Sequence, residues 1–367
     1  MSLNIVILGL ALRSSWGNGH ATTYRALIRA LRERGHRVRF LERDTPWYAD
    51  NIDADDDVAS CIALYGGFEE LMDVYTGEVA NADLVIVGSY VPEGIDIGAW
   101  VQATATGVTA FYDIDTPVTL AAVDVGRCDY LDARLIAGYA LYLSFTGGPT
   151  LAYLNRHYGA NARPLYCAVD PAKYTPQMAR SEFDLGYMGT YSDDRQPTVH
   201  RLLLEVAAEW PSGQFIVAGA QYPKTVRWPR NVEHVEHIGP QEHRYFYNAQ
   251  RFTLNVTRAD MIRAGWSPSV RLFEAAACGV PIISDDWPGI ESIFQPDREI
   301  LIAHDGADVL RWLRDMPDAR RIAIGNAARR RVLAEHTAAH RAEALEGYVA
   351  QLPRRSTFPV FTTELVS

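Results

Sequence analysis

Residues 255–292 constrain the fold of this chain more than any other stretch. They read as a loop, an apolar helix and a buried strand in succession. Ser267 can cap the helix, and Gly279 stands where a helix must end. Residues 280–283 form an apolar run that leads into a polar loop. Ligands of open α/β sheets lie outside the carboxyl ends of the strands. The helix carries one carboxylate, Glu274, and we expect it to be buried close to such a ligand.

Apolar runs alternate with helical patterns in both halves of the chain, which is typical of parallel βαβ units. We expect strands at 4–10, 37–42, 84–87, 108–112, 141–145, 183–188, 215–218, 252–256 and 280–284. We expect helices at 22–34, 307–315, 318–335 and 337–351. The pattern predicts an α/β protein with two Rossmann-like α/β/α domains that face a deep interdomain cleft.

The length of 367 residues suits two domains. A linker is indicated at 167–176, where two prolines interrupt a stretch without any period. We therefore predict an N-terminal domain at 1–169 and a C-terminal domain at 170–340. Residues 341–367 are expected to form a final helix and tail that pack back on the N-terminal domain.

The composition is that of an ordinary globular protein, with 48% hydrophobic and 22% charged residues. The net charge is −10, and no polybasic run stands apart from the helices, so we do not expect a nucleic-acid partner. No segment reads as a signal peptide or a membrane span. The four cysteines have no paired metal-ligand spacing, and free thiols in a reducing cytosol are the better interpretation. We expect a cytoplasmic protein, and the oligomeric state stays open.

Residues 274–281 read EAAACGVP. This resembles the nucleotide-sugar site of GT-B glycosyltransferases, whose pattern is Glu, seven residues, then Glu-Ala-x-Ala-x-Gly-x-Pro. The first Glu of that pattern would fall at position 266, which is Trp266 in this chain. From 142 to about 348 the chain also looks like the CgeB-like (spore-maturation type) branch of GT-B. The motifs that carry this resemblance are 145–148, 185–191 and 267–274.

The resemblance implies two Rossmann-like domains, with the acceptor on the side of the first and a nucleotide-diphosphate sugar held mainly by the second. It implies no metal, so cations and helix N-termini would neutralise the diphosphate. Arg195 suits that role because a guanidinium binds phosphate oxygens in a fork, although a solvated surface arginine is the alternative. The donor residues predicted in this way are Gly19, Gly189, Thr190, Tyr191, Arg195, Lys224, Arg258, Arg271, Glu274 and Asp286.

Glu274 has two interpretations. It stands three residues after Arg271, so the two could pair along one helix face. Alternatively, its carboxylate accepts both ribose hydroxyls of a nucleotide. We favour the ribose role.

Three residues of the first half are candidate catalytic groups. His20 follows the glycine-rich segment 17–19 and titrates near neutrality, so it could act as a base; capping its own helix is the alternative. Asp113 and Asp115 follow the strand at 108–112 and could bind sugar hydroxyls or take a proton from an acceptor. A turn or helix-cap role is the alternative for Asp115.

Two histidine pairs have spacings that could suit a metal. They are His234 with His237 and His336 with His340. Nothing in the sequence completes either set, so we predict no metal site. We expect the second pair to lie on the exposed face of a C-terminal helix.

The resulting hypothesis is a metal-independent glycosyltransferase of hexosyltransferase type, with an unidentified acceptor and slightly favoured retention of configuration. An inverting displacement becomes the alternative if His20 or Asp113 is a base. A nucleotide-sugar 2-epimerase of the same fold and a non-catalytic nucleotide-sugar-binding protein are the competing functions.

Overall fold

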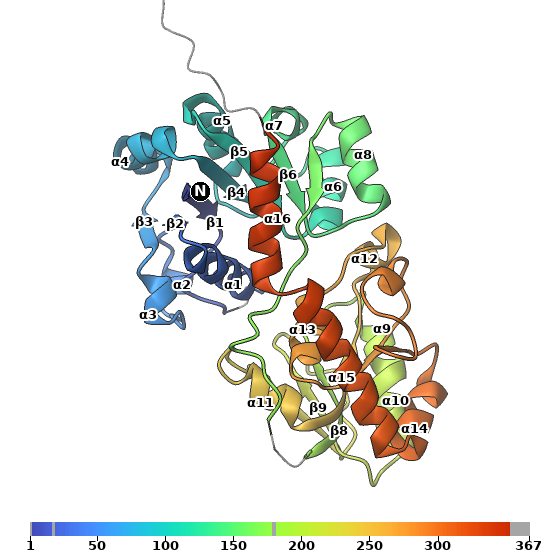
Figure 1. The fold of residues 1–367 in the computed structure, drawn as a ribbon. Helices are drawn as coiled ribbons and strands as arrows, with labels where there is room; N and C mark the ends of the chain where they lie inside the picture. The colour runs from blue at the N-terminus through green and yellow to red at the C-terminus, as the bar shows by residue number, and fades with distance from the viewer. Residues whose placement is uncertain (1, 17–18, 178–180, 353–367) are drawn as a thin grey trace, which may run out of the picture.

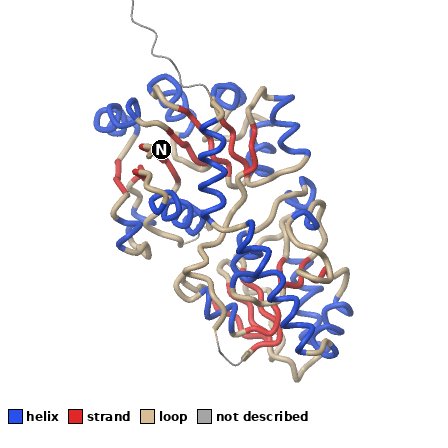
Figure 2. Tube along the Cα trace, viewed as in Figure 1, coloured by secondary structure: helices blue, strands red, loops and turns tan. Residues whose placement is uncertain are grey.

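The computed structural model describes residues 2–16, 19–177 and 181–352. Figures 1 and 2 show two lobes, each built on a sheet that is flanked by helices. The first sheet has seven strands in the order β3-β2-β1-β4-β5-β6-β7, and the second has six in the order β10-β9-β8-β11-β12-β13. Neighbouring strands pair in parallel in both sheets of the described chain. The predicted α/β class with two Rossmann-like lobes is confirmed.

The N-lobe runs from β1 to β7. Its strands are β1 (Asn4–Gly9), β2 (Arg37–Arg43), β3 (Ile62–Tyr65), β4 (Leu84–Gly88), β5 (Val108–Asp113), β6 (Leu141–Ser144) and β7 (Ala162–Pro164). Its helices are α1 (His20–Glu33), α2 (Pro46–Ala49), α3 (Asp56–Ala59), α4 (Phe68–Asn81), α5 (Gly94–Thr104), α6 (Thr116–Asp124), α7 (Ala133–Gly138) and α8 (Pro149–His157).

The C-lobe runs from β8 to α15. Its strands are β8 (Phe183–Met188), β9 (Phe215–Ala218), β10 (Val232–Val235), β11 (Gln250–Asn255), β12 (Ile282–Ser284) and β13 (Leu301–Ile302). Its helices are α9 (Gln196–Val199), the π-helix His200–Leu204, α10 (Glu205–Glu209), α11 (His243–Asn248), α12 (Ala259–Ala264), α13 (Val270–Ala277), the 3-10 helix Ile290–Ser292, α14 (Gly306–Asp315) and α15 (Asp318–Glu335). The last helix, α16 (Ala338–Ala350), follows it.

The helix that carries Glu274 begins later than the sequence indicates. Ser269, and not Ser267, occupies the cap position of α13, and it makes no side-chain cap bond. Ser267 is buried, and its hydroxyl bonds that of Thr146 in the N-lobe at 2.5 Å. The cap prediction for Ser267 is therefore wrong, because a contact between the lobes takes its hydroxyl.

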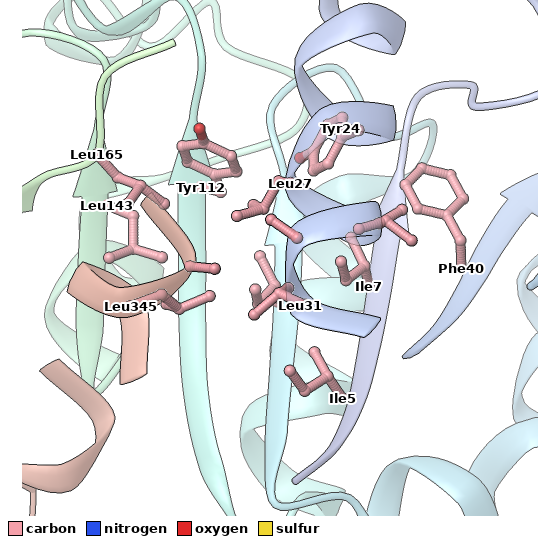
Figure 3. Close-up of a cluster of buried hydrophobic side chains, with 14 of the residues drawn as sticks. Ile5, Ile7, Tyr24, Leu27, Leu31, Phe40, Tyr112, Leu143, Leu165 and Leu345 are labelled. Carbon is pink, nitrogen blue, oxygen red and sulfur yellow. The ribbon is translucent and has the colours of Figure 1, made fainter. Parts of the chain in front are cut away.

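Helix α16 crosses from the C-lobe back to the N-lobe (Figure 1). Its apolar residues Ala338, Ala342 and Leu345 belong to the same buried cluster as Leu31 of α1 and Leu143 of β6. Figure 3 shows Leu345 on the same side of the first sheet as Leu31 and Leu143. The end of the chain thus covers one side of the N-lobe core. The domain boundaries after 169 and 340 stay predictions.

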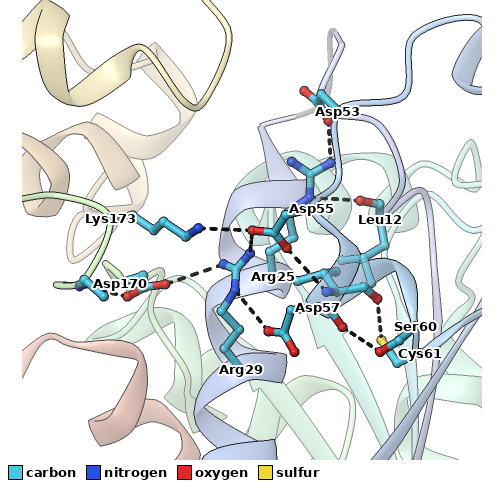
Figure 4. A network of polar contacts seen from close by, with 12 residues as sticks. Leu12, Arg25, Arg29, Asp53, Asp55, Asp57, Ser60, Cys61, Asp170 and Lys173 are labelled. Carbon is cyan, nitrogen blue, oxygen red and sulfur yellow. Dashed lines mark hydrogen bonds and ion pairs between the residues drawn. The ribbon is translucent and has the colours of Figure 1, made fainter.

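Ion pairs join α1 to the segment between the lobes (Figure 4). Arg29 Nη2 lies 2.5 Å from Asp55 Oδ2, and Arg29 Nη1 lies 3.5 Å from Asp170 Oδ2. Lys173 Nζ lies 3.1 Å from the same Asp55 oxygen. These contacts tie the connecting segment to the N-lobe.

Candidate active site

A cavity of about 500 Å³ lies between the lobes, at the carboxyl ends of the C-lobe strands. The C-lobe lines it with the segments after β8, β9 and β10 and with the start of α13, and the N-lobe lines it with the loop after β1 and the start of α1. This is the usual position of ligands in open α/β folds. Five predicted donor residues line it, namely Gly19, Gly189, Thr190, Arg271 and Glu274.

Arg271 is a buried cation in the first turn of α13, with an exposed fraction of 9%. Its Nη1 donates to Asn255 Oδ1 at 2.8 Å, and its Nε donates to the Met188 carbonyl at 2.5 Å. The guanidinium carbon lies 5.0 Å from the ring centroid of Tyr187. These contacts hold the guanidinium beside the loop that follows β8, where it can bind an anion.

Two further arginines gather near Arg271. Arg195 Nη2 donates to the Thr190 carbonyl at 2.5 Å. Burial lowers the pKa of Arg195, and the positive charges of Arg271 and Arg258 lower it further. The Nε groups of Arg195 and Arg258 are buried and have no hydrogen-bond partner in the described part of the chain. Three close cations with two unused donors are suited to a multiply charged anion.

Glu274 is 3% exposed and accepts two tyrosine hydroxyls. Tyr174 donates to Oε1 at 2.8 Å, and Tyr247 donates to Oε2 at 2.9 Å. Arg271 bonds other groups, so the predicted alternative in which Arg271 and Glu274 pair along the helix is wrong. Each carboxylate oxygen has a second lone pair, and Glu274 also lines the cavity, so it can still accept hydroxyls from a ligand.

Asp115 faces the C-lobe from the end of β5. Its Oδ2 accepts the Tyr90 hydroxyl at 2.8 Å and lies 3.6 Å from Arg258 Nη1. Asp115 stands at the cap position of α6 but makes no side-chain cap bond, which contradicts the helix-cap alternative. Burial raises the pKa of Asp115, while the Tyr90 hydroxyl and the charge of Arg258 lower it.

Asp113 lies in the interior and does not line the cavity. Its Oδ2 accepts the Tyr142 hydroxyl at 2.5 Å, and its Oδ1 accepts the Thr119 hydroxyl at 2.7 Å. Burial raises the pKa of Asp113 to about 6. These contacts favour a role in joining β5 to β6 and α6.

His20 is the first residue of α1. Burial lowers its pKa to about 4, so the imidazole is neutral near pH 7. Its ring centroid lies 5.6 Å from that of Tyr90, the residue that bonds Asp115. His20 and Asp115 are thus brought together through Tyr90. Residues 17 and 18 of the predicted glycine-rich segment lie outside the described residues.

Trp266 takes part in a contact between the lobes. The backbone N–H of Gly147 donates to the Trp266 carbonyl at 2.9 Å. The indole is so close to Gly148 and Gly289 that a methyl group on either glycine would overlap it. Trp266 itself has a left-handed φ of 45°. The residue that replaces the first Glu of the motif therefore packs between the two lobes.

Besides Arg195 and Arg258, which belong to the arginine cluster, three predicted donor residues do not line the cavity. Lys224 and Asp286 are exposed. Tyr191 is half-buried, and its hydroxyl donates to Asp193 Oδ1 at 2.8 Å. The donor roles of these residues stay predictions that the geometry does not support.

Four aromatic residues of the site were not predicted from the sequence. Tyr174 and Tyr247 hold Glu274, Tyr90 holds Asp115, and Trp16 lines the cavity with its ring centroid 4.3 Å from that of His237. Tyr90 and Trp16 carry a weak signal, since each follows a predicted strand. The two tyrosines around Glu274 carry none, because they lie 100 and 27 residues away from it.

The described residues hold no group of three His, Cys, Asp or Glu side chains that could bind a metal ion. His336, which we expected on an exposed face, is instead buried at 7% exposure. Among the helices of the described chain, none is long and apolar enough to span a membrane.

Two comparisons with known proteins found matches, one with solved structures over nearly the whole chain and one with a family model over part of it. Solved structures of similar fold cover nearly the whole chain. Sucrose-phosphate synthase from Thermosynechococcus elongatus matches with a TM-score of 0.68 and 16% identity over 95% of this chain and 98% of that one. Anabaena HepE in complex with UDP and glucose matches with a TM-score of 0.71 and 11% identity over 95% and 100%. An alpha-glucosyltransferase in complex with UDP-glucose and DNA containing an abasic site matches with a TM-score of 0.73 and 11% identity over 96% and 100%.

The chain therefore has the GT-B fold. Residues 195–347 match the family model described as "Glycosyl transferase-like", so much of the C-lobe is similar to that family. No curated protein matches the chain in sequence. The narrower CgeB-like assignment stays a prediction.

Proposed function

We propose that the protein is a glycosyltransferase that moves a sugar from a nucleotide-diphosphate sugar to a hydroxyl acceptor. The bond from the anomeric carbon to the diphosphate breaks, and its electron pair leaves with the nucleoside diphosphate. The enzyme must then stabilise the negative charge that develops on the leaving group.

The arginine cluster carries this proposal. Arg195, Arg258 and Arg271 stand close together, and two of them have a buried Nε–H without a partner in the described chain. Buried donors are usually satisfied, so unused ones indicate a missing acceptor. A diphosphate supplies several charged oxygens. The cluster can take over the neutralising role of a metal ion, and we propose metal-independent transfer for this reason.

Glu274 supports a nucleotide as the carrier of that diphosphate. It lines the same cavity as Arg271, one helical turn further along α13. A carboxylate held by two tyrosines keeps lone pairs free for the two ribose hydroxyls. The cavity thus offers an anion site and a diol site at neighbouring positions.

UDP-hexoses are the first donors to test, because the similar structures of HepE and alpha-glucosyltransferase were determined with UDP and glucose or with UDP-glucose. We propose retention of configuration from the motif at 274–281. The replacement of its first Glu by Trp266 weakens that argument, so the anomeric configuration of the product needs a direct NMR measurement.

The experiment is incubation of the protein with several nucleotide sugars, with and without EDTA. Calorimetry measures binding, and chromatography measures nucleoside diphosphate release and sugar interconversion. Release that EDTA leaves unchanged supports metal-independent transfer. Interconversion indicates an epimerase, and binding without turnover indicates a sensor. A protein that binds no nucleotide sugar would contradict the proposal.

A further inference from the structure

One oxygen of the Asp115 carboxylate has no partner. Asp115 is 8% exposed, and its Oδ2 accepts the Tyr90 hydroxyl. Its Oδ1 is buried and makes no hydrogen bond with any part of the chain that the structure describes. Leaving a charged acceptor buried and unsatisfied is unfavourable, because the group has lost its hydrogen bonds to water. A ligand that donates a hydrogen bond to this oxygen would satisfy it.

The carboxylate is held in position by a strained residue. Tyr90 has a φ of 64°, the left-handed region that bulky residues rarely adopt. It lies two residues after the end of β4, and its ring centroid lies 4.8 Å from that of Tyr130. Backbone strain of this kind persists where the surroundings enforce it, and it gathers at functional sites. In this conformation the Tyr90 hydroxyl donates to Asp115 Oδ2.

The Asp115 carboxylate also lies next to the arginine cluster. Arg258 Nη1 is 3.6 Å from Asp115 Oδ2, across the boundary between the lobes. Arg258 influences Arg195 electrostatically, and Arg195 in turn contacts Thr190 of the cavity wall. In the proposed donor the anomeric carbon of the sugar is bonded to the diphosphate. If the diphosphate binds to these arginines, the anomeric carbon lies close to them. The acceptor must approach the same region to attack that carbon.

We infer that Asp115 Oδ1 binds the acceptor hydroxyl and that Tyr90 is the residue that positions this carboxylate. The inference rests on the proposed glycosyltransferase function and adds to it the two N-lobe residues that place the acceptor hydroxyl. Its oxygen bonds to the anomeric carbon as the bond from that carbon to the diphosphate breaks. As the new bond forms, the hydroxyl proton leaves its hydrogen bond to Asp115 Oδ1 and goes to the released phosphate oxygen. Asp115 orients the hydroxyl for this step.

The test replaces Asp115 by Asn and uses water and glycerol as acceptor probes. Tyr90 and Arg258 both present donors to the Oδ2 position, so they should hold the amide oxygen there. The amide NH₂ then replaces Oδ1, and a donor stands where the hydroxyl needs an acceptor. We expect Asp115→Asn to slow nucleoside diphosphate release about 10- to 100-fold, while the calorimetric Kd of the donor stays the same or becomes tighter.

Tyr90→Phe keeps the ring and removes the hydroxyl that positions Asp115. We expect a loss of about fivefold, seen mainly as a higher KM for glycerol. Asp124→Asn is the matched control, because Asp124 is an exposed acid at the end of α6 that also accepts tyrosine hydroxyls, from Tyr153 and Tyr158. It should transfer at the wild-type rate. Thermal melting shows whether each variant is folded.

The outcomes separate the inference from the proposed function. If the wild type binds no nucleotide sugar, the glycosyltransferase proposal itself fails. If it binds the donor, the inference is overturned when Asp115→Asn releases nucleoside diphosphate at the wild-type rate, or when neither water nor glycerol accepts the sugar. It is also overturned if Asp115→Asn and Tyr90→Phe weaken donor binding as much as transfer, since that would indicate a purely structural role.

Discussion

The indole of Trp266 in the C-lobe lies directly against the backbone of Gly148 in the N-lobe. Gly148 has a φ of 55° and cannot carry a side chain without meeting the ring. The backbone N–H of the preceding residue, Gly147, donates to the Trp266 carbonyl at 2.9 Å. Trp266 thus acts as a contact between lobes at the position where related motifs carry a Glu.

Gly148→Ala should destabilise the protein by about 1–3 kcal/mol, because the methyl group overlaps the Trp266 indole and the left-handed φ disfavours alanine. In the double variant with Trp266→Ala the overlap disappears and only the backbone strain remains. Chemical unfolding of both single variants and the double variant gives the coupling energy. Additive effects would show that the two residues do not meet.

Arg271→Ala should weaken nucleoside diphosphate binding by about 1.5–3 kcal/mol, the typical value of hydrogen bonds to charged groups. The loss should be much smaller for the nucleoside alone, because Arg271 is placed for the phosphates. Calorimetry with uridine and UDP measures the difference. Arg263→Ala is the control, since Arg263 is 70% exposed and pairs with Asp260 within α12. An equal loss for both ligands would contradict the assignment.

Glu274→Gln should abolish any preference for a ribose diol. We expect UDP affinity to fall by about 1–3 kcal/mol, because the charged acceptor is lost. Wild type should bind UDP more tightly than 2′,3′-dideoxy-UDP, and the variant should bind the two equally. Tyr247→Phe controls for the loss of one buried hydrogen bond, since it leaves the carboxylate in place. A preserved preference in Glu274→Gln would remove the ribose role.

His336 should make the protein less stable in mild acid. Burial lowers its pKa to about 3, and the charges of Arg341 and Arg331 add to this effect. Arg341 Nη2 lies 2.9 Å from His336 Nδ1 and can donate to it only while that nitrogen is unprotonated. Below about pH 6.5 His336 is protonated in the unfolded chain but stays neutral in the folded protein. This group therefore costs about 1 kcal/mol of stability per pH unit between pH 6.5 and 3.

Urea unfolding of wild type and His336→Gln at several pH values isolates this effect. The stability difference between the two proteins should move in favour of the variant as the pH falls from 7 to 4. The pKa of Asp113 is raised to about 6, so this group makes the folded state more stable as the pH falls. Both proteins contain Asp113, so its effect cancels in the difference between them. His304→Gln, at an exposed position, should show no such change. Parallel curves for wild type and His336→Gln would disprove the prediction.

The sequence alone determined the strands that are buried on both sides. Strands β5 and β9 lie where the apolar runs predict them, as does helix α15. Local signals suffice for such elements, because a continuous apolar run or a helical period exists before any tertiary contact. The edge strands β3, β7 and β13 went unpredicted, since they are short or partly exposed and depend on a neighbour for their hydrogen bonds.

The tertiary structure alone decided how the predicted site residues are used. Ser267 bonds Thr146, which lies 121 residues away, and so does not cap α13. Glu274 accepts from Tyr174, 100 residues away, and does not pair with Arg271 on its own helix. Asp115 meets Arg258 only because two lobes close on each other. Partner choice for a buried polar group depends on which donors the fold brings near it, and sequence spacing does not contain that information.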